Sequence, residues 1–319
     1  MDNYDNTNYD SSYSGSVVIG GGSTIDSEDT GIVVVGRQTI TGRLVVNNAE
    51  ITAKYYAICG NGSNDNTQIT INRGTITSEE ANAIFHPQGG TLNITGGVIT
   101  GVSGVQFCGY GTLNISGDVE IRATGDFCEH PTKSADQTDG SVNDGAALSI
   151  VSRGPGYQND DNQNMIVNIS GGTFISDHNE AVRVYRFQRV NDNWVSNENT
   201  SLESRIQSLN VDGGIFVSGG QDGDFEIDRE AENAILVSDG NFSAPMNRDY
   251  LAEGLNAELY SGNSQTPYSY YESVDDALAA AQPGDVVTDL TNVSSNVMCE
   301  VRVDYYGNGS YETLSVRSG

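Results

Sequence analysis

Four carboxylates that alternate along one short stretch are the side chains best suited to chemistry in this sequence. Asp222, Asp224, Glu226 and Asp228 occur within QDGDFEIDRE. On a strand, alternate residues share one face, so the four carboxylates would point the same way. Calcium takes oxygen ligands of this kind, and the stretch is therefore a candidate calcium site. A solvated run of charges is the alternative, since no complete calcium-loop motif is present. No other cofactor is indicated.

Cysteines give a second candidate site. If GDFC repeats the preceding VQFC in the next unit of a stacked repeat, Cys108 and Cys128 lie about 4.8 Å apart, within the ~4.4–6.8 Å range of a disulfide. A Cys–His metal site that includes His86 is one alternative, and thiols that form neither are another. If AALSI (residues 146–150) is instead the next stacked strand, this column of residues does not exist.

Arginine is the one candidate base in the expected strands. Arg183, within AVRVYR, and Arg153 are the residues concerned. Arginine stays protonated in ordinary surroundings, so it needs a strong environmental cause to accept a proton. No acidic cluster aligns with either arginine at the repeat spacing. An exposed Arg183 paired with a neighbouring carboxylate is the favoured interpretation, and the sequence leans away from an enzyme.

Long insertions, and a predicted strand beside one of them, carry the residues that are candidates for binding. The insertions are 129–145, 154–164 and 187–207. The candidate binding residues are Trp194, Tyr157, Tyr185 and Arg183. Loops on a rigid scaffold commonly carry binding sites, and aromatic rings are favoured there. We expect the insertions to gather on one side of the molecule. Insertions without a function are the alternative, because lengthening a surface loop costs little entropy.

All of these residues lie in or between copies of one repeated phrase, such as TLNITGGVIT, TLNISGDVEI and VNISGGTFIS. Alternation predicts a strand with two inward columns. The first is Leu44, Ile69, Leu92, Leu113, Val167, Leu209 and Ile235; the second is Val46, Ile71, Ile94, Ile115, Ile169, Val211 and Val237. Outward residues between them are mostly polar, and Asn93 and Asn114 are expected to bond along a ladder. Glycine then marks a bend, where a missing Cβ permits positive φ.

The spacing of the copies predicts a coil. Leu44, Ile69, Leu92 and Leu113 are separated by 25, 23 and 21 residues. That length holds two or three short strands of about five residues each, including a second apolar element such as NAIFHPQG or AALSIVSRG. Such units must stack to bury their apolar faces. The fold class expected is all-β, a right-handed parallel β-helix, because parallel crossovers are right-handed. A leucine-rich repeat and an antiparallel sandwich fit less well.

Composition restricts the partners. The formal net charge is −28, with 43 acidic and 15 basic residues, which disfavours nucleic acid and anionic membranes. No apolar run approaches the ~20 residues of a membrane-spanning helix, so no membrane insertion is expected. The polar composition resembles that of extracellular proteins.

The expected organisation has three parts. Residues 1–15 are a disordered tail, 16–245 the parallel β-helix, and 246–319 a small α+β C-terminal cap or the start of a following module. Within the last part, Ser273 is a good N-cap for a short helix that ends at Pro283. A solenoid needs such a cap because its open strand edge would otherwise pair with another chain.

The rungs of type LNI-[ST]-GG-x-[IF] at Leu92, Leu113, Val167 and Leu209 resemble pectate-lyase-like parallel β-helix modules of surface and adhesin proteins from Gram-positive bacteria. The resemblance implies a secreted or cell-surface protein with a structural or adhesive role. Its partner would be a glycan or a host-surface protein, and the chain would be a monomer or associate end to end. A polysaccharide lyase or glycoside hydrolase that acts in a groove on the coil is the alternative. A phage or filament component is a second alternative.

Overall fold

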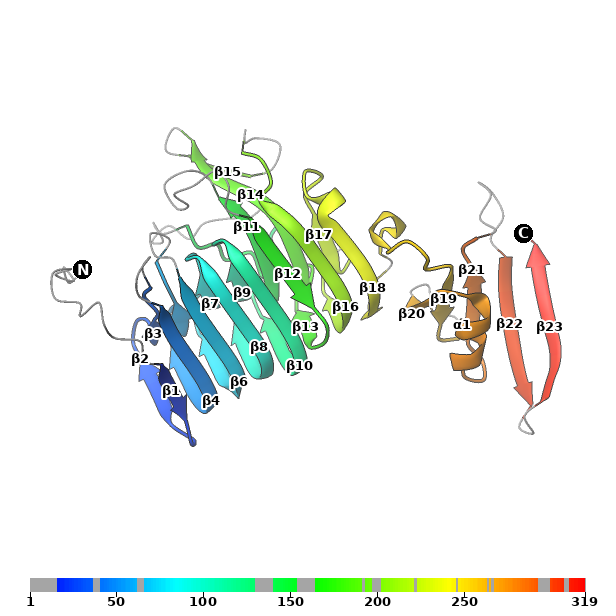
Figure 1. Cartoon of the computed structure of the whole chain (residues 1–319), viewed down its shortest axis with the longest axis horizontal. Helices are drawn as coiled ribbons and strands as arrows, with labels where there is room; N and C mark the ends of the chain where they lie inside the picture. The colour runs from blue at the N-terminus through cyan, green and yellow to red at the C-terminus, as the bar shows by residue number, and fades with distance from the viewer. Residues whose placement is uncertain are drawn as a thin grey trace.

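Most of the chain is a stack of parallel strands that runs along the longest axis of the molecule, with a separate small sheet at the C-terminal end (Figure 1). The protein is seen in a computed structural model, which describes residues 16–36, 41–61, 66–129, 140–153, 164–190, 193–196, 202–220, 223–244, 246–262, 264, 267–291, 299–306 and 310–318. The expected tail, residues 1–15, lies outside these ranges.

Sheet A contains the long copies of the repeat. Its strands are β1 (Val17–Gly20), β2 (Thr24–Ser27), β4 (Gly42–Ala53), β6 (Thr67–Ser78), β8 (Gly90–Gly101), β10 (Gly111–Ala123), β12 (Met165–Ile169), β13 (Thr173–Ser176), β16 (Ile206–Ser218) and β18 (Ile235–Phe242). Each pairs in parallel with the strand of the next repeat. The predicted columns are confirmed: Leu92 lies beside Leu113, Ile94 lies beside Ile115, and all four are buried.

The predicted bend divides sheet A into two walls of the coil. In β10, the residues before the bend pair with β12, and those after it pair with β13. Gly97 at the bend of β8 has φ 104°, a backbone conformation that other residues rarely adopt. Beyond the bend, the rings of Phe174, Phe216 and Phe242 stack with centroids 4.9 and 5.2 Å apart. The bend therefore lets one strand line two walls of the same core.

Sheet B forms the remaining wall and contains the second apolar element. Its strands are β3 (Ile32–Val33), β5 (Ile58–Cys59), β7 (Asn82–His86), β9 (Ser103–Phe107), β11 (Leu148–Arg153), β14 (Val182–Val190), β15 (Asn193–Ser196) and β17 (Phe225–Ile227). All pairings are parallel except that of β15, which forms an antiparallel hairpin with β14. The predicted parallel β-helix is confirmed.

A five-stranded antiparallel sheet with one helix follows the coil. Its strands are β19 (Ala257–Tyr260), β20 (Pro267–Tyr271), β21 (Val286–Asp289), β22 (Cys299–Tyr306) and β23 (Ser310–Ser318). Helix α1 (Val274–Ala280) begins after Ser273, whose hydroxyl accepts from the Asp276 amide as predicted. Two 3₁₀ turns, Glu232–Ala234 and Arg248–Tyr250, flank the last coil strand. Within the described residues, no helix has the length and apolarity needed to cross a membrane.

Candidate functional site

The middle strands of sheet B are buried on both faces, and a segment of the first insertion covers their outer side. Every residue of β7, β9 and β11 is buried. Residues 140–147, named here the covering segment, run across the outward side chains. The Gln106 amide of β9 donates to the Gly140 carbonyl (3.3 Å) and accepts from the Val142 amide (2.9 Å). Ser141 shares a 2.6 Å hydrogen bond with the Tyr56 hydroxyl.

Asp144 is the polar centre of the covering segment. Its carboxylate is fully buried and accepts from the Ser103 hydroxyl (2.9 Å) and the Ser149 hydroxyl (2.6 Å). It also accepts from the Tyr185 hydroxyl (2.8 Å) and the Ala146 amide (3.1 Å). A buried carboxylate is costly unless its lone pairs are satisfied, and four donors satisfy this one. Asp144 thereby ties β9, β11 and β14 to the covering segment.

Arg183 of β14 lies beside this centre, on the same outer face. The guanidinium pairs with Glu226 of β17, lies 3.8 Å from Glu180, and donates to the Cys128 and Glu129 carbonyls at 2.9 Å. Arg183 is fully buried. The prediction of a carboxylate partner is thus met, but the prediction of an exposed arginine is wrong, because residues 126–129 and the covering segment enclose the side chain.

Glu226 also corrects the alignment expected from the sequence. No acidic cluster was found to align with Arg183 at the repeat spacing, yet one carboxylate, Glu226, is its register partner in the adjacent strand. The two residues are 43 apart in the chain, because the third insertion lies between them. An insertion of this length breaks the regular repeat spacing, so the sequence does not reveal that the two residues are neighbours in space.

The electrostatics oppose a role for Arg183 as a base. Burial alone would lower the pKa of its guanidinium, but its neighbours, led by the Asp144 and Glu226 carboxylates, together outweigh burial and raise the pKa above its ordinary value. Burial, followed by the Asp144 charge, raises the pKa of the Tyr185 hydroxyl well above its ordinary value. Both groups therefore keep their protons near neutral pH.

The acidic stretch forms the last strand of sheet B, and its carboxylates have other partners. Asp224 accepts from the Ser243 hydroxyl (2.6 Å) and the Ala244 amide (2.9 Å). Glu226 pairs with Arg183, and Asp228 pairs with Arg186. Among the described residues, no three His, Cys, Asp or Glu side chains are placed to hold a metal ion. Asp222 lies outside those residues, so a calcium site that includes it stays a prediction.

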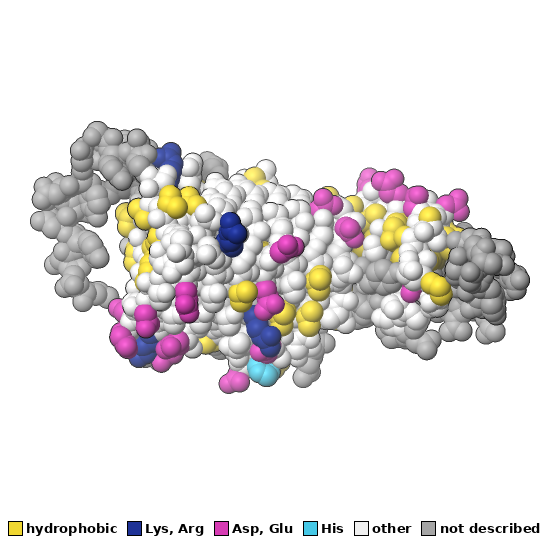
Figure 2. All heavy atoms as spheres, turned by 90° about the horizontal axis from the view of Figure 1, so that it is seen from below, with side chains coloured by type: hydrophobic (Ala, Val, Ile, Leu, Met, Phe, Trp, Pro, Cys, Tyr) yellow, Lys and Arg dark blue, Asp and Glu magenta, His cyan; other side chains and the backbone are white. Residues whose placement is uncertain are grey.

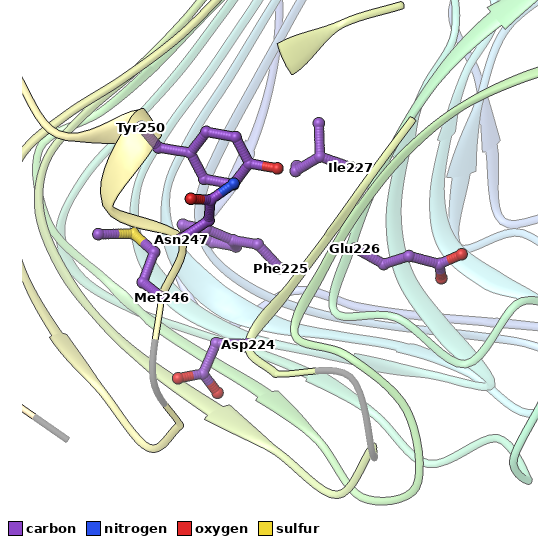
Figure 3. Close-up of a pocket in the computed structure, with 7 residues that line it drawn as sticks. All are labelled: Asp224, Phe225, Glu226, Ile227, Met246, Asn247 and Tyr250. Carbon is purple, nitrogen blue, oxygen red and sulfur yellow. The ribbon is translucent and has the colours of Figure 1, made fainter. Parts of the chain in front are cut away.

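A pocket lies at this end of the coil, between β17 and the segment that follows β18. Its volume is about 310 Å³. Its lining residues are Asp224, Phe225, Glu226, Ile227, Met246, Asn247 and Tyr250. In Figure 3 the Phe225, Met246, Asn247 and Tyr250 side chains gather on one side of β17, whereas Glu226 points away from them. The pocket therefore opens on the inward face of the strand, opposite Arg183.

The aromatic candidates do not share a site in the described structure. Tyr185 is buried beneath the covering segment. The backbone of Trp194 belongs to β15, where it pairs with Arg189, but its side chain lies outside the description. Tyr157 also lies outside the described residues. The expected gathering of the three insertions stays a prediction, apart from the covering segment that the first insertion supplies.

The column proposed for Cys108 and Cys128 does not exist. Strand β9 stacks on β11, with Val105 beside Leu148, so AALSI is the next strand and GDFC is not. His86 lies beside Phe107 instead of Cys108. No disulfide joins Cys108, which is buried, to Cys128, which is half-buried. The sequence left GDFC and AALSI as alternatives for the next strand, and the structure selects AALSI, the longer apolar run, which is fully buried.

The outward asparagines of sheet A form the predicted ladder. The Asn114 amide donates to Asn93 (2.8 Å), Asn168 to Asn114 (2.9 Å) and Asn210 to Asn168 (2.9 Å). These side chains are half-buried and lie on the outer surface of the coil. Seen from below in Figure 2, the coil surface is mostly neither hydrophobic nor charged. On the face seen in this view, neither apolar nor charged side chains therefore dominate the surface of the coil.

Sequence reasoning missed the residues that hold the outer face together, namely Asp144, Gln106, Ser103 and Ser149. A signal was available in the strands, because NAIFH and LSIVSR lack the alternation expected of a strand with one wet face. Comparisons of the chain with protein-family models, with curated proteins and with solved structures give no match.

Proposed function

We propose that this chain is a structural and adhesive module of a secreted or cell-surface bacterial protein, of the kind that pectate-lyase-like β-helices form in adhesins. The observation that carries the proposal is the ladder from Asn93 to Asn210 on the accessible face. Each inner amide uses one N–H and one lone pair on its neighbours and keeps a second of each. Such a row of donors and acceptors fits the hydroxyl groups of a glycan or the polar surface of a host protein.

The surroundings of Arg183 support binding over polysaccharide cleavage. A lyase needs a group that takes a proton from its substrate. Arg183 is fully buried, holds its proton more tightly than usual, and faces carboxylates and carbonyls of its own chain. Arg153 of β11, the other candidate base, is likewise buried on the outer side of sheet B, where its guanidinium donates to the Cys108 sulfur at 3.6 Å.

A glycan and mucin array tests the proposal. We expect the protein to bind defined spots and to release no product from acidic polysaccharides. The double change Asn114→Ala and Asn168→Ala should weaken binding at least tenfold, because it removes the two inner ladder amides. Thr100→Ala, on the neighbouring outward face of β8, should leave binding unchanged. A blank array, or release of sugar products by the wild type, would contradict the proposal.

End-to-end association is a second candidate, favoured by the N-terminal end of the coil. Val17, Val18 and Val33 are 55%, 64% and 55% exposed on the first strands of the two sheets. Exposed edge strands of this kind pair readily with other chains. Light scattering should show a mass that rises with concentration, and Val18→Lys should suppress the rise. A mass that stays monomeric at every concentration would remove this candidate.

A further inference from the structure

The last strand of sheet B has one paired edge and one open edge. Among the described strands, β17 pairs with β14 alone. The Val182 amide of β14 donates to the Asp224 carbonyl at 3.0 Å. Successive residues of a strand direct their backbone groups to opposite sides, so the N–H and C=O groups of Phe225 and Ile227 point away from β14.

Space for the inward side chains of a further strand lies next to the open edge. The pocket of about 310 Å³ adjoins Phe225 and Ile227, and Tyr250 lies opposite them (Figure 3). Both residues of β17 are only half-buried, whereas their register partners in β14, Val182 and Val184, are buried. The coil thus ends with two apolar side chains that no further strand covers within the described part of the chain.

Acidic side chains gather on the outward side of this edge. Arg183 and Glu226 are neighbours in one outward column, and Glu180 and Asp144 also face the guanidinium. Three carboxylates therefore surround one cation. Burial raises the pKa of Glu226 despite its contact with Arg183, which indicates that its charge is incompletely compensated. A strand added beyond Glu226 would gain most from a cation at the aligned position.

We propose that the open edge of β17 binds an extended peptide of apolar–basic–apolar sequence, which adds to sheet B as its next strand. The two apolar side chains would stack on Phe225 and Ile227, and the central lysine or arginine would lie beside Glu226. Main-chain hydrogen bonds supply affinity in this mode, and alternate side chains supply specificity. The inference goes beyond the proposed function, because it concerns the end of the coil and not its polar face.

The probe is a labelled pentapeptide, AVRVY, with blocked ends. This is the sequence of residues 181–185, whose Val182, Arg183 and Val184 already pair with the other edge of β17. Fluorescence polarisation with the whole chain measures its binding. The matched peptide AVEVY, with glutamate in place of arginine, should bind at least tenfold more weakly. Hydrogen exchange should slow at the Phe225 and Ile227 amides when AVRVY is present.

Two proline variants locate the site. Ile227→Pro removes a backbone donor from the open edge and leaves the bonds to β14 in place, so AVRVY binding should fall at least tenfold. Val33→Pro is the matched control at the opposite end of sheet B. The amides of Ile32 and Val34 donate to the next strand, so that of Val33 also points to an open edge. This control should bind AVRVY as the wild type does.

The outcomes divide cleanly. Equal binding of AVRVY and AVEVY, or an equal loss in both proline variants, would overturn the proposal. Absence of binding at millimolar peptide would overturn it as well. If Ile227→Pro fails to fold, Met246→Trp replaces it. The larger side chain fills the pocket and should block the binding of AVRVY. Unimpaired binding by Met246→Trp would contradict the proposal.

Discussion

At the scale of single residues, the unusual feature is how much charge is buried outside the apolar core. Arg183 and Asp144 are fully buried, yet they lie on the outer side of sheet B and not among the inward columns. Each is tolerated because neighbouring acceptors or donors replace the water that it loses. Removing one member of such a buried set should therefore destabilise the protein more than removing one member of an exposed ion pair.

Arg183→Met should lower the free energy of unfolding by about 3 kcal/mol, because it leaves Glu226 and Glu180 without their buried partner. Urea denaturation measures the change. Arg122→Met is the control, since the Arg122–Asp177 pair is partly exposed and should contribute less than about 1 kcal/mol. Equal losses in the two variants would mean that burial of Arg183 has no energetic consequence.

His86 should make stability depend on pH. Burial lowers its pKa from 6.5 to about 4, and neither ring nitrogen has a hydrogen-bond partner among the residues that the structure describes. The unfolded chain therefore takes up a proton before the folded chain does. The contribution of neutral His86 to the free energy of unfolding is fully present above about pH 6.5. It decreases as the pH falls from there to about 4 and levels off below, with a total loss of about 3 kcal/mol.

Denaturation of wild type and His86→Phe across this range isolates the effect. Phenylalanine suits the site, because the His86 ring already stacks on Phe107 with centroids 5.2 Å apart. The variant should lose the part of the pH dependence that His86 causes and keep the part due to other groups. Identical pH profiles for the two proteins would show that His86 does not supply it.

At the scale of elements, the strands of sheet A and sheet B differ in what each face meets. Strand β8 has one dry and one wet face, so alternation is visible in its sequence. Strand β9 meets the core on one face and the covering segment on the other, and all of its residues are buried. Gly140 allows this close cover, because a Cβ there would lie 1.5 Å from a terminal nitrogen of Arg153.

Two substitutions at adjacent positions of β8 test the assignment of its faces. Ile94→Asp places an unpaired charge in the core and should cost roughly 4 kcal/mol or more. Asn93→Asp keeps the oxygen that accepts from Asn114 and should cost less than about 1 kcal/mol. Denaturant titration compares them, and similar losses would show that the register of the strand is wrong.

At the scale of the whole molecule, the coil and the C-terminal sheet meet through a small polar and aromatic contact. Arg248 pairs with Glu258 (2.7 Å), which also accepts from the Tyr260 hydroxyl (2.6 Å). Burial, together with this hydrogen bond, raises the pKa of Tyr260 to about 12. The rings of Phe242, at the end of the coil, and Tyr270, in the sheet, lie 6.1 Å apart.

Glu258→Ala should loosen the C-terminal sheet and spare the coil. The change leaves Arg248 and Tyr260 without their common acceptor, at a cost of about 1–3 kcal/mol. Limited proteolysis should then cut faster between the coil and the sheet, while the coil fragment stays resistant. Equal sensitivity of the coil would indicate that the two parts unfold as one unit.

The sequence by itself determined the stacking of sheet A. Its apolar columns, bend glycines and asparagine ladder follow from a pattern that each repeat carries locally, so Leu92 could be placed beside Leu113 without coordinates. The tertiary structure decided what covers sheet B and which charges meet there. Asp144 and Glu226 reach Arg183 from 39 and 43 residues away, across insertions of unequal length. The sequence periodicity is lost at an insertion, so only the packing of the folded chain determines which distant segment pairs with a buried charge.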